Sequence, residues 1–113
     1  MSYERVVKTL MSLGLSQAEA YVYVYLAADG PQKAKNIADA LRLQDMLLYQ
    51  SLENLESKGL VKAIRENIAL FYALPFNNAL DLLLKAHVKQ AQEVDNDRKG
   101  ILAKWKRMVN KSV

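Results

Sequence analysis

The 113-residue sequence contains no cysteine, one histidine, two prolines and four glycines. Without cysteine, disulfides and thiolate metal sites are excluded. No apolar run reaches the roughly 18 residues of a membrane-spanning helix, and the first five residues lack the apolar core of a secretory signal. We therefore expect a cytoplasmic protein that has no contact with a membrane and needs no metal or other cofactor.

Patterns typical of catalysis are also missing from the sequence. A single histidine, His87, cannot form a metal site without spaced partners, and the chain has neither a glycine-rich phosphate loop nor a clustered pair of carboxylates. The sequence therefore predicts a protein that is not an enzyme.

Acidic residues are absent from the end of the chain. Residues 98–113 contain six basic side chains and no acidic one. The first 97 residues hold the other ten basic residues and all twelve acidic residues, which gives them a net charge of −2. The overall charge of +4 therefore comes from the tail, and it is no evidence that the rest of the chain binds nucleic acid. The six basic residues are Arg98, Lys99, Lys104, Lys106, Arg107 and Lys111.

A globular domain is indicated by the composition, 51% hydrophobic and 25% charged. Apolar residues at helical spacing predict a first helix over residues 4–13, which ends at Gly14. Ser16 and Glu19 form a capping box that starts a second helix, which ends near Gly30. Residues 21–25 alternate tyrosine and valine like a strand, but the capping box and the surrounding alanines favour a helix.

Two short helices and a hairpin are predicted next. Helical spacing indicates helices over residues 33–41 and 45–58, and the second of these has a leucine seam joined by Tyr49. Two alternating segments, 61–65 and 68–74, are typical of strands joined at Glu66 and Asn67. The fold class is therefore mainly α with a small β-hairpin. The order predicts a winged helix-turn-helix over residues 1–76, with residues 45–58 as the recognition helix and 61–74 as the wing.

Residues 77–113 are predicted to form one long helix that pairs as a coiled coil in a homodimer. Seam residues recur at alternating spacings of four and three, the heptad pattern of a coiled coil. A helix of about 50 Å overhangs so small a domain, which favours a dimer over packing against the same chain. Gly100 predicts a kink nearby, and His87 is expected to fix the register of the seam. The predicted interface consists of Leu80, Leu84, His87, Ala91, Val94, Ile101, Trp105 and Met108, with Arg98 as a polar seam position.

Four segments resemble the TrmB-like transcriptional regulators, which are found mainly in archaea: LGLSQAEAYVYVYL (13–26), KAKNIADAL (33–41), LYQSLENLESKGLV (48–61) and ALPFNNALDLLLK (73–85). The resemblance covers about residues 5–90. It implies a dimeric winged-helix DNA binder whose long C-terminal helix supplies much of the dimer contact. Many members carry a further sugar-binding domain, for which a chain ending at Val113 leaves no room, so sugar sensing is not expected.

The recognition helix departs from the family pattern. The family usually carries Arg, Lys or Ser around the Leu-Tyr pair, where this chain has Asp45, Met46, Leu47 and Gln50. The wing tip, often basic in the family, holds an acidic and an amide residue. These departures put base reading by this helix in question.

Polar and aliphatic side chains are nevertheless suited to one kind of DNA contact. With the leucine seam inward, Leu47, Gln50, Ser51 and Asn54 are expected to face outward. Gln and Asn can pair with adenine, and an aliphatic side chain can touch a thymine methyl; the same residues are also ordinary on a solvated helix face. The predicted DNA-contacting residues are Lys33, Lys35, Asn36, Arg42, Gln44, Met46, Leu47, Gln50, Ser51, Asn54, Lys62 and Arg65.

Three functions compete on this evidence. Residues 31–67 hold six basic and five acidic side chains, which predicts weak, steeply salt-dependent binding to double-stranded DNA. The exposed Met46 and Leu47 beside Asp45 favour, as the alternative, a module that binds a protein partner. The third possibility is a structural dimer whose basic tail alone touches nucleic acid. The amphipathic tail (101–109) is interpreted as a seam end, as phosphate-contacting or, least favoured, as a membrane-surface helix.

Overall fold

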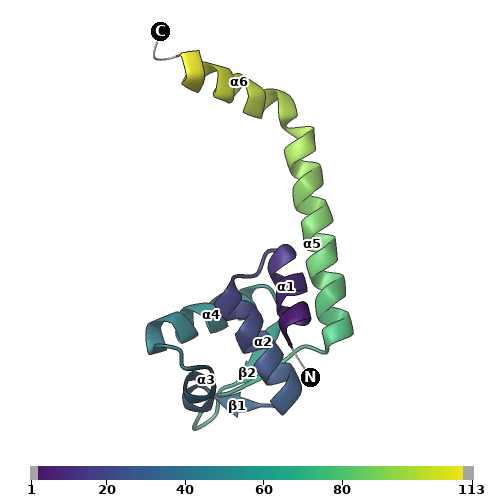
Figure 1. The fold of residues 1–113 in the computed structure, drawn as a ribbon. Helices are drawn as coiled ribbons and strands as arrows, with labels where there is room; N and C mark the ends of the chain where they lie inside the picture. The colour runs from purple at the N-terminus through teal and green to yellow at the C-terminus, as the bar shows by residue number, and fades with distance from the viewer. Residues whose placement is uncertain (1–2, 111–113) are drawn as a thin grey trace.

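Residues 3–110 are described by a computed structural model (Figure 1). Lys111, which belongs to the predicted basic tail, lies outside these residues. The N-terminal part of the chain folds into a helical domain with a small sheet. A long helix extends from this domain and then bends (Figure 1). The elements are α1 (Glu4–Ser12), α2 (Gln17–Asp29), β1 (Gln32–Lys33), α3 (Ala34–Leu41), α4 (Asp45–Ser57), β2 (Val61–Ile64), β3 (Leu70–Ala73), α5 (Phe76–Asn96) and α6 (Arg98–Asn110).

Helix α2 runs through the centre of the domain. The predicted capping box is present: the Ser16 hydroxyl accepts the amide of Glu19 at 3.1 Å, and the Glu19 carboxylate accepts the amide of Ser16 at 3.0 Å. Val22, Tyr23 and Val24 are all buried, so the helix is covered on most sides. A helix that is apolar all round is a core helix, which explains why the alternating tyrosines and valines form no strand.

The helix-turn-helix consists of α3 and α4. Ile37 of α3 and Leu48 of α4 are almost completely buried. Arg42 ends α3 in the left-handed conformation, with φ 55°, and its amide bonds the carbonyl of Ala38. A non-glycine residue in this conformation is strained and occurs mostly where a tight turn is needed. The turn therefore fixes the angle at which α4 follows α3.

The wing contains three strands, in the order β1-β3-β2, all antiparallel. The sequence predicted the hairpin but missed β1, a two-residue strand in which Gln32 pairs with Phe71 and Lys33 with Leu70. The hairpin is also shorter than predicted: residues 65–69 form a five-residue loop between β2 and β3, in place of a tight turn. So short a strand as β1 carries no periodicity of its own, because it exists only by pairing with β3.

Helix α5 buries side chains against the domain only in its first part, and residues up to Gln90 line a hollow shared with Leu13 and Lys58. The Tyr23 hydroxyl donates to the carbonyl of Leu74, and its ring lies 6.4 Å from the ring of Phe76. Ala79 and Leu83 are buried against the domain. Beyond them, every residue from 84 to 110 is exposed.

The C-terminal segment is helical as predicted, but it is not one helix. Helix α5 ends at Asn96, and α6 starts at Arg98 and turns sharply away from it (Figure 1). The break lies at Asp97, three residues before the glycine that predicted it. Gly100 lies within the first turn of α6, where the amide of Ile101 bonds the carbonyl of Asp97 at 3.0 Å. The kink predicted near Gly100 is therefore present as a break at Asp97, and it divides the predicted helix into α5 and α6.

Candidate nucleic-acid interface

Helix α4 buries one residue that was predicted to face outward. The leucines at positions 48, 52 and 55 are buried as expected, and Ser51 is buried with them at 3% exposure. Its hydroxyl donates to the carbonyl of Leu47 at 2.8 Å, so its polar group is satisfied within the helix. The outward orientation predicted for Ser51 is wrong, because positions 48, 51, 52 and 55 form one helical stripe.

The exposed side of α4 is centred on Met46, Gln50 and Glu53. Met46 is 82% exposed, and helical spacing places all three opposite the buried stripe. This side is turned from the predicted one by roughly one residue step, about 100°. Leu47 lies on one flank of it and Tyr49 on the other. Tyr49 is 57% exposed, so the prediction that it joins the leucine seam is wrong.

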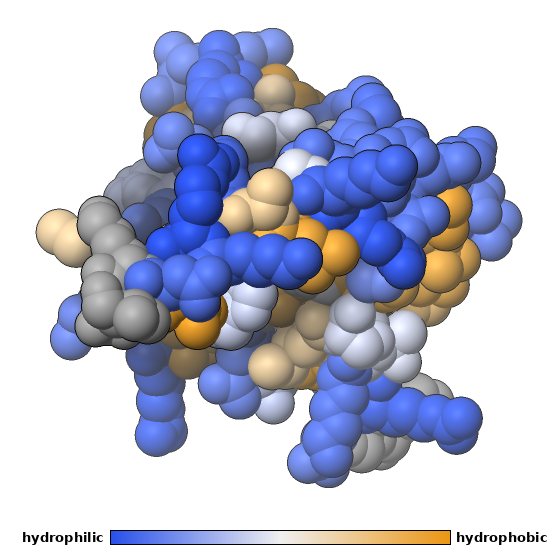
Figure 2. All heavy atoms as spheres, turned by 90° about the horizontal axis from the view of Figure 1, so that it is seen from above, coloured by the Kyte–Doolittle hydropathy of each residue, from blue (hydrophilic) through white to orange (hydrophobic). Residues whose placement is uncertain are grey.

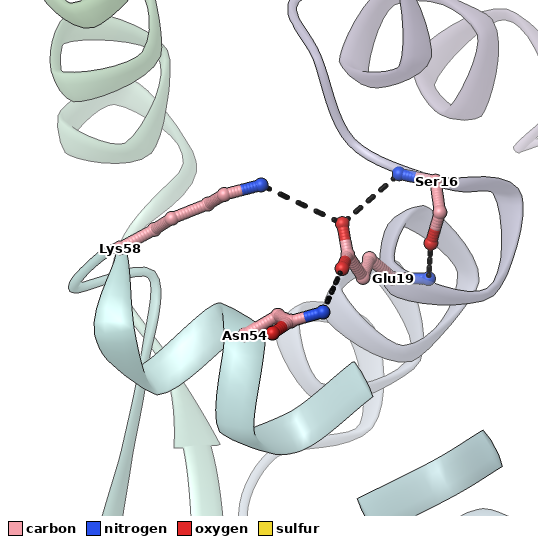
Figure 3. A network of polar contacts seen from close by, with 4 residues as sticks. All are labelled: Ser16, Glu19, Asn54 and Lys58. Carbon is pink, nitrogen blue, oxygen red and sulfur yellow. Dashed lines mark hydrogen bonds and ion pairs between the residues drawn. The ribbon is translucent and has the colours of Figure 1, made fainter. Parts of the chain in front are cut away.

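Asn54 is exposed, but its amide is turned toward α2 (Figure 3). Its Nδ2 donates to the carboxylate of Glu19 at 2.9 Å, and the Lys58 ammonium lies 3.6 Å from the other carboxylate oxygen. The same carboxylate accepts the amide of Ser16. Glu19 therefore connects the start of α2 to the end of α4. Asn54 would have to leave this network to pair with adenine.

Glu19 is charged in this network. Burial raises the pKa of its carboxyl, but the hydrogen bonds from the Ser16 and Asn54 amides, together with the Lys58 ammonium, outweigh burial, so the pKa lies below its ordinary value. The sequence indicated only the link to Ser16, through the capping box. Nothing in the local pattern indicated the contacts to α4, because they join residues 35 and 39 positions away.

Some basic residues of the helix-turn-helix and wing are paired with a carboxylate, and others are unpaired and so available to bind phosphate. Lys58 is held by Glu19, and Arg65 of the wing is held by both carboxylate oxygens of Glu56, at 2.8 and 3.0 Å. Within residues 3–110, four exposed cations of this region form no ion pair with a carboxylate. They are Lys33, Lys35, Arg42 and Lys62.

Two of these lysines share the outer face of the sheet. The pairing register puts Lys62 beside Tyr72, and Leu70 between Lys33 and Ile64. Neighbouring residues on paired strands point to the same face, and the opposite face carries the buried side chains of Val61 and Phe71. The outer face is therefore a mixed basic and apolar surface beside the recognition helix.

The remaining predicted polar contacts are exposed. Asn36 lies in the first turn of α3, where its Nδ2 donates to Oε1 of Gln32 at 3.3 Å. Gln44 precedes the first turn of α4 without a side-chain cap bond. Both therefore lie near the N-termini of the two helices of the motif.

An apolar hollow of about 380 Å³ lies beside the N-terminal end of α4. Its lining includes Tyr21 from α2, Leu41 at the end of α3, Arg42 and Leu43 from the turn, and Leu47. Met46, next along α4, is the most exposed of the large apolar residues described. This end of the recognition helix is therefore more apolar than basic.

Most residues of the predicted dimer interface are exposed in the single chain. Leu84 is 49% exposed, Trp105 60% and Met108 70%, while Leu80 is half-buried. The bend brings Ala91 and Ile101 to the same hollow of about 260 Å³, on the inner side of the break. The other seam positions are His87, Val94 and Arg98. The seam therefore follows a concave surface and not a straight rod.

Neither a metal site nor a membrane span is found in the part of the chain that the structure describes. Residues 3–110 contain no group of three or more metal-ligating side chains. None of the helices described is long and apolar enough to cross a membrane.

A helix-turn-helix followed by an antiparallel wing defines the winged-helix class. Within that class, the family model described as "Sugar-specific transcriptional regulator TrmB" matches residues 10–77. The match covers more than half of the chain, so the chain belongs to the TrmB family of transcriptional regulators, as its sequence motifs predicted. Family and fold are those of regulators and not of enzymes.

Solved structures with the same fold include several regulators. TrmBL2, an archaeal chromatin protein, superposes with a TM-score of 0.78 and 20% identity over 99% of this chain. The chain spans only 43% of the length of TrmBL2. A possible transcriptional regulator from Methanosarcina mazei gives 0.65 with 17% identity and 88% coverage of each chain. A MarR-family regulator from Silicibacter pomeroyi gives 0.56 with 20% identity, over 92% of this chain and 77% of its own. None of the curated proteins matches this chain.

Proposed function

We propose that this chain is a dimeric regulator that binds double-stranded DNA through α4 and the wing. The observation that carries the proposal is the set of uncommitted cations on the elements next to α4 in the motif: Lys33 and Lys35 at the start of α3, Arg42 in the turn, and Lys62 on the wing. Phosphate contacts from such positions fix the register of a recognition helix on the duplex. The TrmB family and the winged-helix fold support this assignment, and TrmBL2 is described as a DNA-binding protein.

Base reading would fall to Met46, Leu47 and Gln50. Gln50 can pair with adenine, and the two apolar side chains can contact thymine methyl groups. Glu53, one turn further along the exposed side, disfavours phosphate near the C-terminal half of the helix. The N-terminal half of α4 is therefore the part proposed to enter the major groove, and A·T-rich sites are preferred.

A second copy is proposed to cover the exposed side of α5 and α6. No residue from 84 to 110 is buried in the single chain, and α6, with 13 residues, is of a length at which an isolated helix is marginal in water. The exposed apolar residues at the seam positions are a sufficient reason for pairing. A dimer would present two α4 helices to successive major grooves about 34 Å apart, and repression or activation would follow from occupying the site.

The DNA-binding proposal is tested by fluorescence anisotropy with labelled duplexes at about 50 and 200 mM salt, because phosphate binding is steeply salt-dependent. Lys33→Gln together with Arg42→Asn should weaken binding to all sequences alike and reduce the salt slope by about 2 per protomer. Asn tolerates the left-handed backbone at position 42, so the turn is kept. The matched control is Lys8→Gln on α1. No binding by the unaltered protein at the lower salt would contradict the proposal.

Sequence preference and pairing are tested separately. Gln50→Ala with Met46→Ala should remove the preference for one duplex over another and leave the salt slope unchanged. Leu84→Asp should convert the dimer to a monomer in sedimentation equilibrium, with Lys85→Gln as the control. An unchanged mass for Leu84→Asp would show that this seam is not the interface.

A protein-binding role is the second candidate, and it is favoured by the apolar hollow next to Met46 and Leu47. An apolar side chain of a partner would fit this hollow better than a phosphate group does. The variant Leu47→Gln distinguishes the DNA-binding role from the protein-binding role. This change should leave non-specific DNA binding intact, and it would abolish capture of a partner that inserts into the hollow.

A further inference from the structure

Charge changes abruptly at the bend between α5 and α6. Helix α5 carries acidic residues up to its end, including Glu93 and Asp95, and Asp97 occupies the break. Helix α6 contains five basic residues and no acidic one. Seen from above, this end of the molecule shows long hydrophilic side chains around smaller apolar areas (Figure 2). The fold therefore separates a basic segment from the rest of the chain.

Most of the basic and apolar residues of α6 lie on different sides of the helix. Helical spacing places Ile101, Trp105 and Met108 on one side, with Leu102 and Val109 beside them. Lys99, Lys106 and Arg107 lie around the other side, and Lys104 lies at the edge of the apolar side, beside Ile101 and Met108. The apolar side carries predicted dimer contacts, so pairing would leave three cations facing solvent and Lys104 at the rim of the interface.

These four cations are also uncommitted. Across residues 3–110, the only ion pair of α6 joins Arg98 to Asp95, and none of the other four basic residues meets a carboxylate. The wing arginine, Arg65, is by contrast neutralised by Glu56. Helix α6 thus supplies as many free cations as the helix-turn-helix and wing together.

We propose that α6 is a second DNA-binding surface, which contacts the phosphates of double-stranded DNA through Lys99, Lys104, Lys106 and Arg107. The proposal rests on the proposed function in that its ligand is DNA. Helix α5 has 21 residues, so α6 begins about 31 Å from the start of α5, and it is a separate element from the helix proposed to enter the groove. Lysine and arginine contacts to phosphate carry no sequence information. The surface therefore adds affinity and no base preference.

A membrane surface is the competing ligand for a basic amphipathic helix. Insertion into a membrane needs the apolar side of the helix to be free. In α6 that side continues the predicted seam through Ile101, Trp105 and Met108, and the hollow at the bend joins it to α5. With the apolar side covered in a dimer, the free cations of α6 suit an anionic ligand that needs no apolar contact. The phosphate backbone of DNA is such a ligand.

The test replaces all four cations by glutamine, which keeps the helix because glutamine is a good helix former. The variant Lys99→Gln, Lys104→Gln, Lys106→Gln, Arg107→Gln is compared with Lys85→Gln, Lys89→Gln on α5, and circular dichroism checks helicity. Each phosphate contact contributes about 0.9 to the salt slope, so the slope should fall by about 3 to 4 per protomer, equally on every duplex. An unchanged slope would overturn the proposal.

Trp105 provides an independent readout, because it is the only tryptophan in the chain. Its fluorescence should respond to duplex DNA in the unaltered protein and not in the quadruple variant. A blue shift with phosphatidylserine vesicles and no response to DNA would assign α6 to a membrane and overturn the proposal. If the quadruple variant of α6 keeps the salt slope of the unaltered protein while Gln50→Ala still alters sequence preference, the second surface is wrong and the proposed function stands. If the unaltered protein binds no duplex at all, both are wrong.

Discussion

The domain and the C-terminal helices differ in how far their charged residues are paired. Inside the domain, carboxylates hold the neighbouring cations: Glu19 binds Lys58, and Glu56 binds Arg65. Beyond residue 84 of the described chain, one exposed pair, Arg98 with Asp95, is the only ion pair. Ion pairs thus hold elements of the domain together, although four of its cations stay free, whereas four of the five basic residues of α6 have no carboxylate partner among the described residues.

Apolar residues show the same contrast. The domain buries its leucines and valines around α2, while the extension exposes Leu84, Val94, Trp105 and others. Burial of a leucine contributes roughly 1.5–3 kcal/mol, so the apolar contribution to stability is concentrated in the domain. The extension has no such source within one chain. Its stability therefore depends on what covers it.

The largest effect is expected for a leucine of the domain. Leu55 has no exposed surface, so Leu55→Ala should lower the free energy of unfolding by about 2–5 kcal/mol through lost burial and the cavity left behind. Leu84→Ala, at an exposed position, should cost far less in dilute protein. Urea denaturation followed by near-ultraviolet circular dichroism measures both. Equal losses would mean that domain and extension fold as one unit.

A smaller effect is expected for the buried carboxylate. Glu19→Gln removes the charge that holds Lys58 and leaves Asn54 with a weaker acceptor, which should lower stability by about 1–3 kcal/mol. Glu53→Gln, on the exposed side of α4, is the control and should change nothing measurable. Similar values for both variants would show that the network contributes no more than a surface charge.

The same carboxylate makes a prediction about acid. Because the pKa of Glu19 is lower in the folded protein than in the unfolded chain, its contribution is present above the unfolded pKa and is lost as the pH falls through the folded one. The stability difference between the unaltered protein and Glu19→Gln should therefore shrink below about pH 4. A difference that stays constant down to pH 2 would contradict the network's electrostatic origin.

Tyr23 connects the domain to the extension and should have a modest effect. Tyr23→Phe leaves the carbonyl of Leu74 without its donor, which should cost about 0.5–1.5 kcal/mol. Burial raises the pKa of Tyr23 to about 12. The folded protein therefore holds this proton longer than the unfolded chain does, and stability should fall as the pH rises from about 10 toward 12. Absorbance titration should show one tyrosine that ionises late, and Tyr23→Phe should abolish that step.

Much of the fold could be predicted because its signals are local. The capping box at Ser16, the buried leucines of α4 and the alternation of the hairpin each act within a few residues. Two features were missed because they depend on distant partners. The strand β1 exists only through β3, and the burial of Ser51 depends on what packs over α4. The bend was predicted near Gly100 and lies three residues earlier, at Asp97. The exposed side of α4 was also predicted wrongly, because it too depends on what packs over α4.

The smallest effect distinguishes free cations from committed ones within the wing. Lys62 is uncommitted among the described residues, whereas Arg65 is held by both oxygens of Glu56 and lies 5.9 Å from the centre of the Phe71 ring. Arg65→Gln should therefore lower stability by about 0–1 kcal/mol, the range of partly exposed ion pairs, and should barely change DNA binding. Lys62→Gln should do the reverse, with unchanged stability and a salt slope lower by about 1 per protomer. Urea denaturation and anisotropy on the same two variants test this, and equal losses of DNA affinity would mean that Arg65 exchanges Glu56 for phosphate on binding.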